Sequence, residues 1–220
     1  MSQDVLVQGY AEICKEFKPF YENLKESITG TESQNLVTSC AIAYSPLIYQ
    51  PEFLFIGWNP NGWLSENLEP LDEFEYISME DCNDSGNSLS RQTREMFKKT
   101  KYFSQFSKAM KTNIFYYGTR STSDFQHITT ILNEHGINPY AFAFNWTQRL
   151  VHLIQPKVIF CEGKMVHNIL AKCYGVDFVW NGKTGHGELP GGIKVLSYAR
   201  CRSIIQNTNE VVEAINKLQL

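Results

Sequence analysis

Apolar residues recur along the first part of the chain at the spacing of a helix. Between residues 4 and 27 they return every three or four positions, with Glu and Lys between them, at Leu6, Tyr10, Ile13, Phe17, Phe20, Tyr21 and Leu24. This spacing predicts helical structure with one buried face. Pro19 predicts a division into a helix pair, and Gly30 ends an N-terminal helical segment that covers residues 1–30.

Four later stretches have the composition of strands. They are rich in apolar, β-branched and aromatic residues, and they lie at 53–56, 112–117, 156–163 and 193–198. The first lies between Pro51 and Gly57, which is typical of a short buried strand. Residues 38–50 are apolar without a regular period and indicate a further short strand.

Helical spacing returns between and after these strands. It predicts helices at 91–110, 123–135, 138–154, 164–173 and 207–218. Strands that alternate with helices favour a mostly parallel sheet that is covered on both faces. No repeat, low-complexity segment or linker interrupts the pattern, so we expect one α/β domain over residues 1–220.

Residues 64–90 lack such a pattern. They are acidic at first, at Glu66, Glu69, Asp72, Glu73 and Glu75, and then rich in turn-forming residues. Loops of this length in compact domains are usually functional or disordered. The segment is therefore either a lid over the residues around Asn59 or a solvated excursion, and we favour the excursion.

The next predicted helix, residues 91–110, has a basic side. The lysines that form this side are interleaved with aromatic residues; they are Lys98, Lys99, Lys101 and Lys108 within the helix and Lys111 directly after it. Such a cluster is either a phosphate-contacting face or a solvated helix face, and the solvated face is the more common of the two.

The overall composition is that of an ordinary globular protein, with 43% hydrophobic and 20% charged residues. The net charge of −3 gives no global electrostatic attraction to nucleic acid, although a local basic patch stays compatible with it. We find no signal-peptide pattern and no apolar run long enough to span a membrane, so we expect a cytoplasmic protein without a membrane partner.

The six cysteines lie at Cys14, Cys40, Cys82, Cys161, Cys173 and Cys201. None forms a C-x-x-C pair, and their spacing matches neither zinc nor iron–sulfur patterns. We therefore expect reduced thiols, no bound metal and no cofactor.

The segment that leaves the first strand carries the most suggestive chemistry. It runs Gly57-Trp58-Asn59-Pro60-Asn61-Gly62-Trp63. A glycine at a strand end lets a backbone N–H approach a ligand, Asn59 offers both a donor and an acceptor, and Trp58 or Trp63 offers a stacking face. A plain strand-ending turn explains the same residues equally well. No nucleophile elbow, P-loop, H-E-x-x-H or G-x-G-x-x-G motif is present.

Four segments together resemble the uracil-DNA glycosylase superfamily. The segment at residues 57–62 is similar to its G-x-N-P-G motif, especially in the mismatch-specific and single-strand-selective branches. Residues 156–164 resemble its P-K-V-I-x-x-x-G-K stretch, Thr112-Asn113 resembles a strand between them, and residues 188–196 resemble the segment before its last catalytic loop. The match covers roughly residues 50–210 in the family's order.

The resemblance implies a three-layer α/β/α fold with a mostly parallel four-stranded sheet and a base pocket at its C-terminal edge. It implies hydrolysis of the N-glycosidic bond of a damaged or mismatched, uracil-type base in DNA, with a role in base excision repair and DNA as the partner. Asn59 would place the attacking water and the Gly57–Trp58 backbone would touch the base. Trp63 would stack on the base, and Asn113 would bind its edge or be only a polar residue at a strand start.

The last loop departs from the family pattern. The family has H-P-S or H-P-A there, whereas this chain has Ser197-Tyr198-Ala199-Arg200-Cys201-Arg202-Ser203. Tyr198, Ala199 or Arg200 takes the histidine position, and Tyr198 would contact the substrate. Arg200 is the chemically most plausible substitute, because a guanidinium stabilises an anionic leaving group or binds a phosphate. A solvent-exposed arginine at a strand end explains Arg200 equally well. Arg202 would serve the leaving group or a phosphate. His186 is a further candidate from a neighbouring loop. The missing histidine leaves a second interpretation open, a catalytically inactive glycosylase-fold module that binds a nucleobase, a nucleotide, nucleic acid or a protein.

Overall fold

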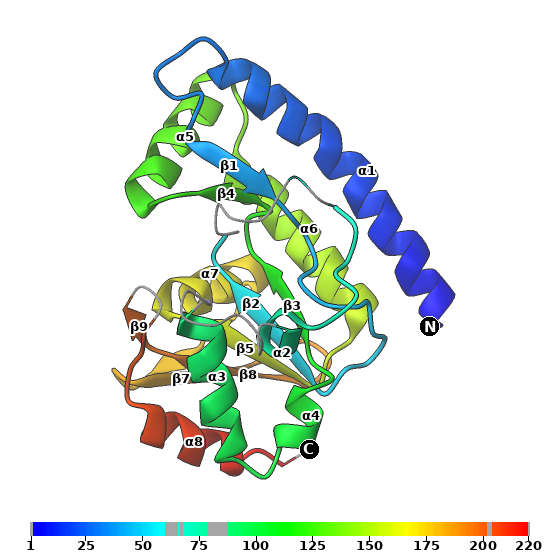
Figure 1. The fold of residues 1–220 in the computed structure, drawn as a ribbon, viewed down its shortest axis with the longest axis vertical. Coiled ribbons are helices and arrows are strands. Elements are labelled where there is room, and N and C mark those ends of the chain that lie inside the picture. The colour runs from blue at the N-terminus through cyan, green and yellow to red at the C-terminus, as the bar shows by residue number, and fades with distance from the viewer. Residues whose placement is uncertain (1, 60–65, 67, 79–87, 202–203, 220) are drawn as a thin grey trace. The chain divides into compact units, whose positions relative to one another are not determined.

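The computed structural model describes residues 2–59, 66, 68–78, 88–201 and 204–219 (Figure 1). The chain divides into two compact units, each assembled from separate segments. Unit 1 comprises Met1–Ile42, Trp58–Glu69 and Asn113–Leu153, and unit 2 comprises Ala43–Gly57, Pro70–Thr112 and Ile154–Leu220. The expectation of a single domain over residues 1–220 stays a prediction.

A six-stranded sheet forms the centre of unit 2. Its order is β3 (Met110–Asn113), β2 (Phe53–Gly57), β5 (Val158–Glu162), β8 (Ile193–Tyr198), β7 (Thr184–Leu189) and β6 (Val179–Trp180). The neighbours β2, β5 and β8 are parallel, whereas β7 is antiparallel to β8 and β6 is antiparallel to β7. The predicted α/β class is confirmed, and the sheet has six strands where the sequence led us to expect four.

Strands β2 and β5 consist almost entirely of apolar residues because both of their faces are covered. Every residue of both strands is buried. Phe55 and Phe160 are paired in the register and stack with 5.0 Å between ring centroids. The same register pairs Ile56 with Cys161, so Gly57 lies alongside Glu162 at the carboxyl ends of the two strands.

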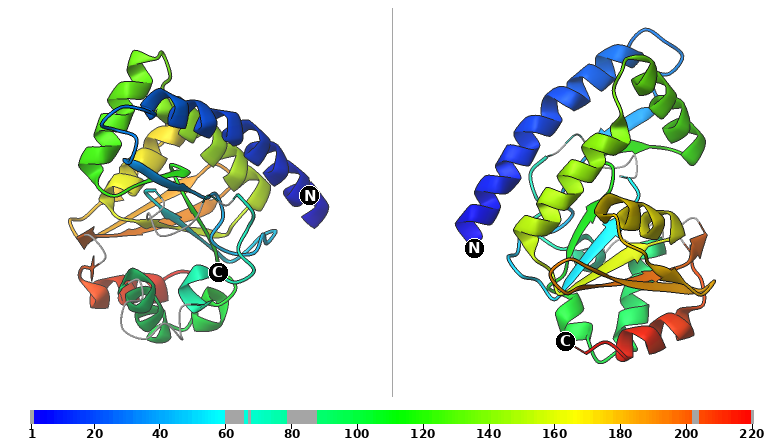
Figure 2. Two further views of the ribbon diagram at one scale, coloured as in Figure 1. Left: turned by 45° about the horizontal axis from the view of Figure 1, so that its top comes forward. Right: turned by 180° about the vertical axis from the view of Figure 1, so that it is seen from behind.

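Helices cover both faces of this sheet. One face packs on α3 (Ser88–Lys98), α4 (Phe103–Phe106) and α8 (Thr208–Asn216), with an aromatic core that includes Phe53, Phe97 and Phe106. The other face carries α7 (Lys164–Tyr174), which lies on the opposite side of the sheet from α8 in Figure 2. The short elements α2 (Glu75–Ser78), β9 (Arg200–Cys201) and β10 (Ile204–Ile205) complete the described part of unit 2.

Unit 1 is built around a long helix and a two-stranded sheet. Helix α1 (Gln3–Ile28), strands β1 (Val37–Cys40) and β4 (Tyr117–Thr119), and helices α5 (Thr122–Glu134) and α6 (Pro139–Ile154) make up its regular structure. The prediction that Pro19 divides the first segment is wrong, because α1 is one helix with Pro19 inside it. Phe17 and Phe20 on either side of Pro19 both pack edge-on against Trp146, and this packing holds the helix continuous.

The region from residue 91 to residue 117 also differs from expectation. The helix predicted over 91–110 is two helices, α3 and α4, and β3 begins at Met110. The strand predicted over 112–117 is likewise divided, since β3 ends at Asn113 and Tyr117 begins β4, which pairs with β1. Lysines at both ends of α4 made the region resemble one amphipathic helix, although Lys111 is a buried strand residue.

Candidate functional site

The carboxyl ends of β2, β5 and β8 meet at one edge of the unit 2 sheet. In parallel α/β sheets, this edge is where ligands are bound. The chain leaves these ends through Gly57, Glu162 and Tyr198, and the register aligns Glu162 with Tyr198 on one side and places it beside Gly57 on the other. Glu162 therefore occupies the middle of the edge.

Glu162 is a buried carboxyl group, with only 2% of its surface exposed. The hydroxyl groups of Tyr76 and Tyr198 both donate to its Oε1 atom, the second across 3.4 Å. Burial raises the pKa of Glu162 to about 7, against an opposing effect from the positive charge of Arg200. A carboxyl group whose pKa lies near neutral pH at a sheet edge is a candidate for a functional role.

Lys111 brings a buried positive charge to the same cluster. Its Nζ lies 2.7 Å from Oε2 of Glu75 and 4.0 Å from Oε2 of Glu162. It also lies over the ring of Tyr76, 4.2 Å from the centroid. Burial lowers the pKa of Lys111, Glu75 opposes that change, and the charge of Arg200 adds to it. The Glu75 carboxylate is therefore the main group that stabilises the Lys111 ammonium.

Arg200 lies next to the cluster on β9. Its side chain passes over Gly163, where an added Cβ would lie 3.5 Å from Cγ and 3.6 Å from Nε of Arg200. These would be ordinary van der Waals contacts, so the neighbour alone would tolerate a side chain. Gly163 has a φ of +113°, a conformation that side chains rarely adopt, so backbone geometry favours glycine here. The arginine is half-buried, and its charge acts on Glu162, Lys111 and Tyr198 alike.

Tyr198, which was predicted to touch substrate, is completely buried. Its pKa is raised well above the ordinary value, first because of burial and then because of the nearby Glu162 charge. It therefore stays protonated and able to donate to Glu162. The structure assigns the hydroxyl to this carboxyl group, and a direct contact of Tyr198 with substrate stays a prediction.

Asn59 lies in unit 1, two residues after Gly57, and its amide has a fixed orientation. Nδ2 donates to Oγ1 of Thr119 across 3.0 Å, and that hydroxyl donates in turn to the carbonyl of Ser121 across 3.1 Å. The threonine hydrogen is committed to Ser121, so Thr119 accepts from Asn59, which identifies the nitrogen. The acceptor atom Oδ1 consequently points away from Thr119.

Of the other predicted site residues, the structure describes Trp58, which is half-buried, and Asn113. The ring of Trp58 packs against Phe115 and Phe125, with centroids 4.9 and 5.0 Å away, and its carbonyl accepts from the Phe115 N–H across 3.0 Å. Asn113, the last residue of β3, is buried. Trp63 and Arg202 lie outside the described residues, and their roles stay predictions.

Four residues of the cluster, Glu75, Tyr76, Lys111 and Glu162, were not expected from the sequence as site residues. Glu75 was placed in a solvated acidic excursion and Lys111 on a basic helix face, and both assignments are wrong because the two side chains are buried against each other. Tyr76 had no recognisable signal. Glu162 had one, since a carboxylate that ends an apolar strand and precedes Gly163 is unusual for a buried position.

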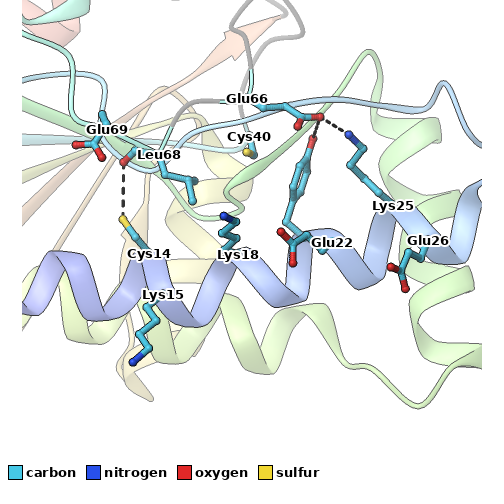
Figure 3. A pocket seen from close by; sticks show the side chains of 11 residues that line it. Cys14, Lys15, Lys18, Glu22, Lys25, Glu26, Cys40, Glu66, Leu68 and Glu69 are labelled. Carbon is cyan, nitrogen blue, oxygen red and sulfur yellow. Dashed lines mark hydrogen bonds and ion pairs between the residues drawn. The ribbon is translucent and has the colours of Figure 1, made fainter.

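A separate cavity of about 640 Å³ lies in unit 1 along α1 (Figure 3). The Lys25 Nζ lies 2.5 Å from Oε1 of Glu66, and the Tyr21 hydroxyl donates to the same oxygen across 3.1 Å. Lys25 is the first cause of the lowered pKa of Glu66. Cys14 and Cys40, both free thiols, also line the cavity. It contains none of the described residues that the sequence marked as site residues.

The described part of the chain contains neither a group of side chains that could hold a metal ion nor a membrane-spanning helix. Among these residues, no three or more His, Cys, Asp or Glu side chains are grouped so that they could hold a metal ion. Of the helices described, none combines the length and the apolar character that crossing a bilayer requires.

No protein-family model and no curated protein matches this chain. Function is therefore inferred from the residues themselves and from the resemblance of their motifs.

Proposed function

We propose that this chain is a DNA glycosylase-like enzyme that hydrolyses the N-glycosidic bond of a damaged or mismatched, uracil-type base in DNA. One observation carries the proposal. Of the segments that resemble the glycosylase superfamily, the one at 57–62 begins at the last residue of β2, the one at 156–164 contains β5, and the one at 188–196 overlaps β8. These three strands are adjacent and parallel in one sheet. Motif pieces that are about a hundred residues apart in the sequence thus contribute to a single carboxyl edge, where α/β folds bind ligands.

The chemistry of that edge fits the reaction. Breaking an N-glycosidic bond leaves positive charge on the sugar and negative charge on the departing base, so the site needs a cation near the base. Arg200 would supply that cation, because its guanidinium is always charged and is half-buried beside the strand ends. Gly57, without a side chain, would let the backbone approach the base.

The remaining roles follow from the resemblance. Asn59 would position the attacking water through its Oδ1 atom, since its Nδ2 atom is committed to Thr119. Asn113 would bind the edge of the base and Trp63 would stack on it. Arg202 would contact the leaving group or a phosphate.

Incubation of the purified protein with defined oligonucleotides tests the proposal. Single- and double-stranded substrates carry uracil, hypoxanthine, xanthine or mismatched thymine, and abasic product is measured at stoichiometric protein. We expect product from at least one uracil-type substrate. No product from any substrate would defeat the enzymatic proposal. Gel shifts across a salt series would then report whether the chain binds nucleic acid without cleaving it.

Arg200→Gln tests the assigned cation against a matched control. We expect it to lower the single-turnover rate constant by roughly 100-fold, since it removes a group that stabilises developing charge. The control Arg91→Gln removes an arginine from an exposed position on α3 and should leave the rate unchanged. Equal rates for the two variants would show that the loss of charge at Arg200 has no catalytic consequence.

A further inference from the structure

The Glu162 carboxyl group is surrounded by ionisable side chains from several neighbouring elements of unit 2. Helix α2, strands β3 and β8, and strand β9 contribute the titratable or charged side chains Glu75, Tyr76, Lys111, Tyr198 and Arg200. Arg94 on α3 donates to the backbone carbonyl of Tyr76 across 3.4 Å. The Glu75 carboxylate and the Lys111 ammonium lie 2.7 Å apart and offset each other. Glu162 itself has a pKa of about 7, so its charge changes near neutral pH.

Arg200 and Glu162 lie on the two sides of one turn. Glu162 ends β5, Gly163 follows it, and the Arg200 side chain passes over Gly163. The two tyrosine hydroxyls hold Oε1 of Glu162 in a fixed place within this arrangement. Glu162 is thus the residue next to the one that the Arg200 side chain passes over, and the Arg200 charge acts on this buried carboxyl group.

We propose that the proton on Glu162 sets the net positive charge that Arg200 presents to the departing base. When Glu162 is ionised, its negative charge offsets the positive charge of the Arg200 guanidinium and disfavours the negative charge that develops on the departing base. When Glu162 is neutral, Arg200 acts without that counter-charge. Glu162 acts through Arg200 and is a positioning residue, not a catalytic one; the proton comes from solvent and is not passed to the substrate. This inference rests on the proposed function.

The titration of Glu162 itself provides the first test. It is followed by NMR of protein labelled with ¹³C at the glutamate carboxyl carbons, and Glu162→Gln identifies the signal. Because the Arg200 charge lowers the pKa of Glu162, Arg200→Gln should raise the midpoint from near pH 7 by about one pH unit. Arg200→Lys keeps the charge and should restore most of the difference, while Arg91→Gln should change nothing. An identical midpoint in wild type and Arg200→Gln would overturn the inference.

The pH dependence of base excision provides the second test. From about pH 6 to about pH 8.5, the single-turnover rate constant of the wild type should fall roughly tenfold, the change that corresponds to one pKa unit of coupling. Glu162→Gln cannot ionise and should keep the higher rate across this range. A loss of rate in Glu162→Gln at all pH values would indicate a purely structural role and would overturn the inference.

The two tests separate this inference from the proposed function. If no substrate yields abasic product, the proposed function fails, whereas a shifted midpoint in Arg200→Gln still supports the charge coupling. If product forms and the pH profiles of wild type and Glu162→Gln coincide, the function stands and the inference is wrong.

Discussion

The two units hold their candidate residues by opposite means. In unit 1, Asn59 is oriented by neutral groups, the hydroxyl of Thr119 and the carbonyl of Ser121. In unit 2, Glu162 is held among buried charges, with Lys111 at 4.0 Å and Arg200 across the Gly163 turn. The hydrogen bonds in unit 1 determine the orientation of the Asn59 amide, and the charges in unit 2 determine the ionisation of Glu162.

This difference determines how each region responds to solution conditions. Neutral hydrogen bonds do not change between mildly acidic and mildly basic pH, so the orientation of Asn59 should be constant. A buried carboxyl group with a pKa of about 7 gains or loses its charge within that range. We therefore expect pH to affect unit 2 through Glu162 and to leave the Asn59 arrangement unaffected.

Removing the buried ammonium should give the largest effect on stability. Lys111→Met leaves the Glu75 carboxylate buried without its ion-pair partner, which costs about 3–5 kcal/mol of unfolding free energy. The additional change Glu75→Leu should recover most of this loss, because no unpaired charge is then left buried. Urea unfolding monitored by tryptophan fluorescence measures both variants.

A matched control for that prediction is the exposed pair on α3. Lys98 lies 2.9 Å from Glu95, and both side chains are largely in solvent. Lys98→Met should cost less than about 1 kcal/mol. If Lys111→Met costs no more than Lys98→Met, the buried cluster has no special role in stability.

Glu162→Gln should change stability in a pH-dependent direction. The pKa of Glu162 is about 7 in the folded protein and 4.5 when unperturbed. As pH rises between these values, the unfolded chain loses this proton and the folded chain keeps it, so the wild type loses about 3 kcal/mol relative to a group that cannot ionise. Glu162→Gln should therefore gain stability relative to wild type from about pH 4 to about pH 8. A constant difference between the two proteins across this range would contradict the raised pKa.

The counterpart in unit 1 is Thr119→Val. It removes the acceptor for Asn59 and the donor to Ser121 while keeping the side-chain shape, and we expect a loss of about 1–2 kcal/mol. Because no charge is involved, the loss should be the same at about pH 5 and about pH 8. If the loss of unfolding free energy varies with pH, the orientation of Asn59 depends on a charged group, and the proposed difference between the units is wrong.

The smallest effect is expected for Tyr198→Phe. Its hydroxyl lies 3.4 Å from Oε1 of Glu162, a long hydrogen bond, so the stability cost should stay below about 1 kcal/mol. The hydrogen bond lowers the pKa of Glu162, so its removal should move the carboxyl titration to higher pH. The NMR titration measures this shift, and a midpoint that moves to lower pH would be inconsistent with donation from Tyr198.

The sequence predicted correctly those elements in which apolar residues are buried and polar residues are exposed. The apolar runs of β2 and β5 and the alternation of strands with helices gave the class of fold and the edge where Gly57 and Glu162 lie. The spacing at 193–198 matches β8, and 164–173 matches α7 to within one residue. In these segments, each residue type suits the environment that it has in the fold.

The missed part of the site consists of residues whose partners are distant in sequence. Lys111 and Glu75 are 36 residues apart, and each resembles a solvated charge until the fold brings them together. The Glu162 carboxyl group depends on Tyr76, which is 86 residues away. Periodicity and local motifs carry no information on such pairs, because the burial of a charge depends on the tertiary partner that stabilises it.

Single-turnover excision of uracil from an oligonucleotide, by wild type and by Arg200→Gln in parallel, tests the central claim most directly. We expect abasic product from the wild type and a rate constant roughly 100-fold lower for Arg200→Gln, with Arg91→Gln equal to wild type. Absence of product from wild-type protein at stoichiometric concentration, or equal rates for wild type and Arg200→Gln, would contradict the account.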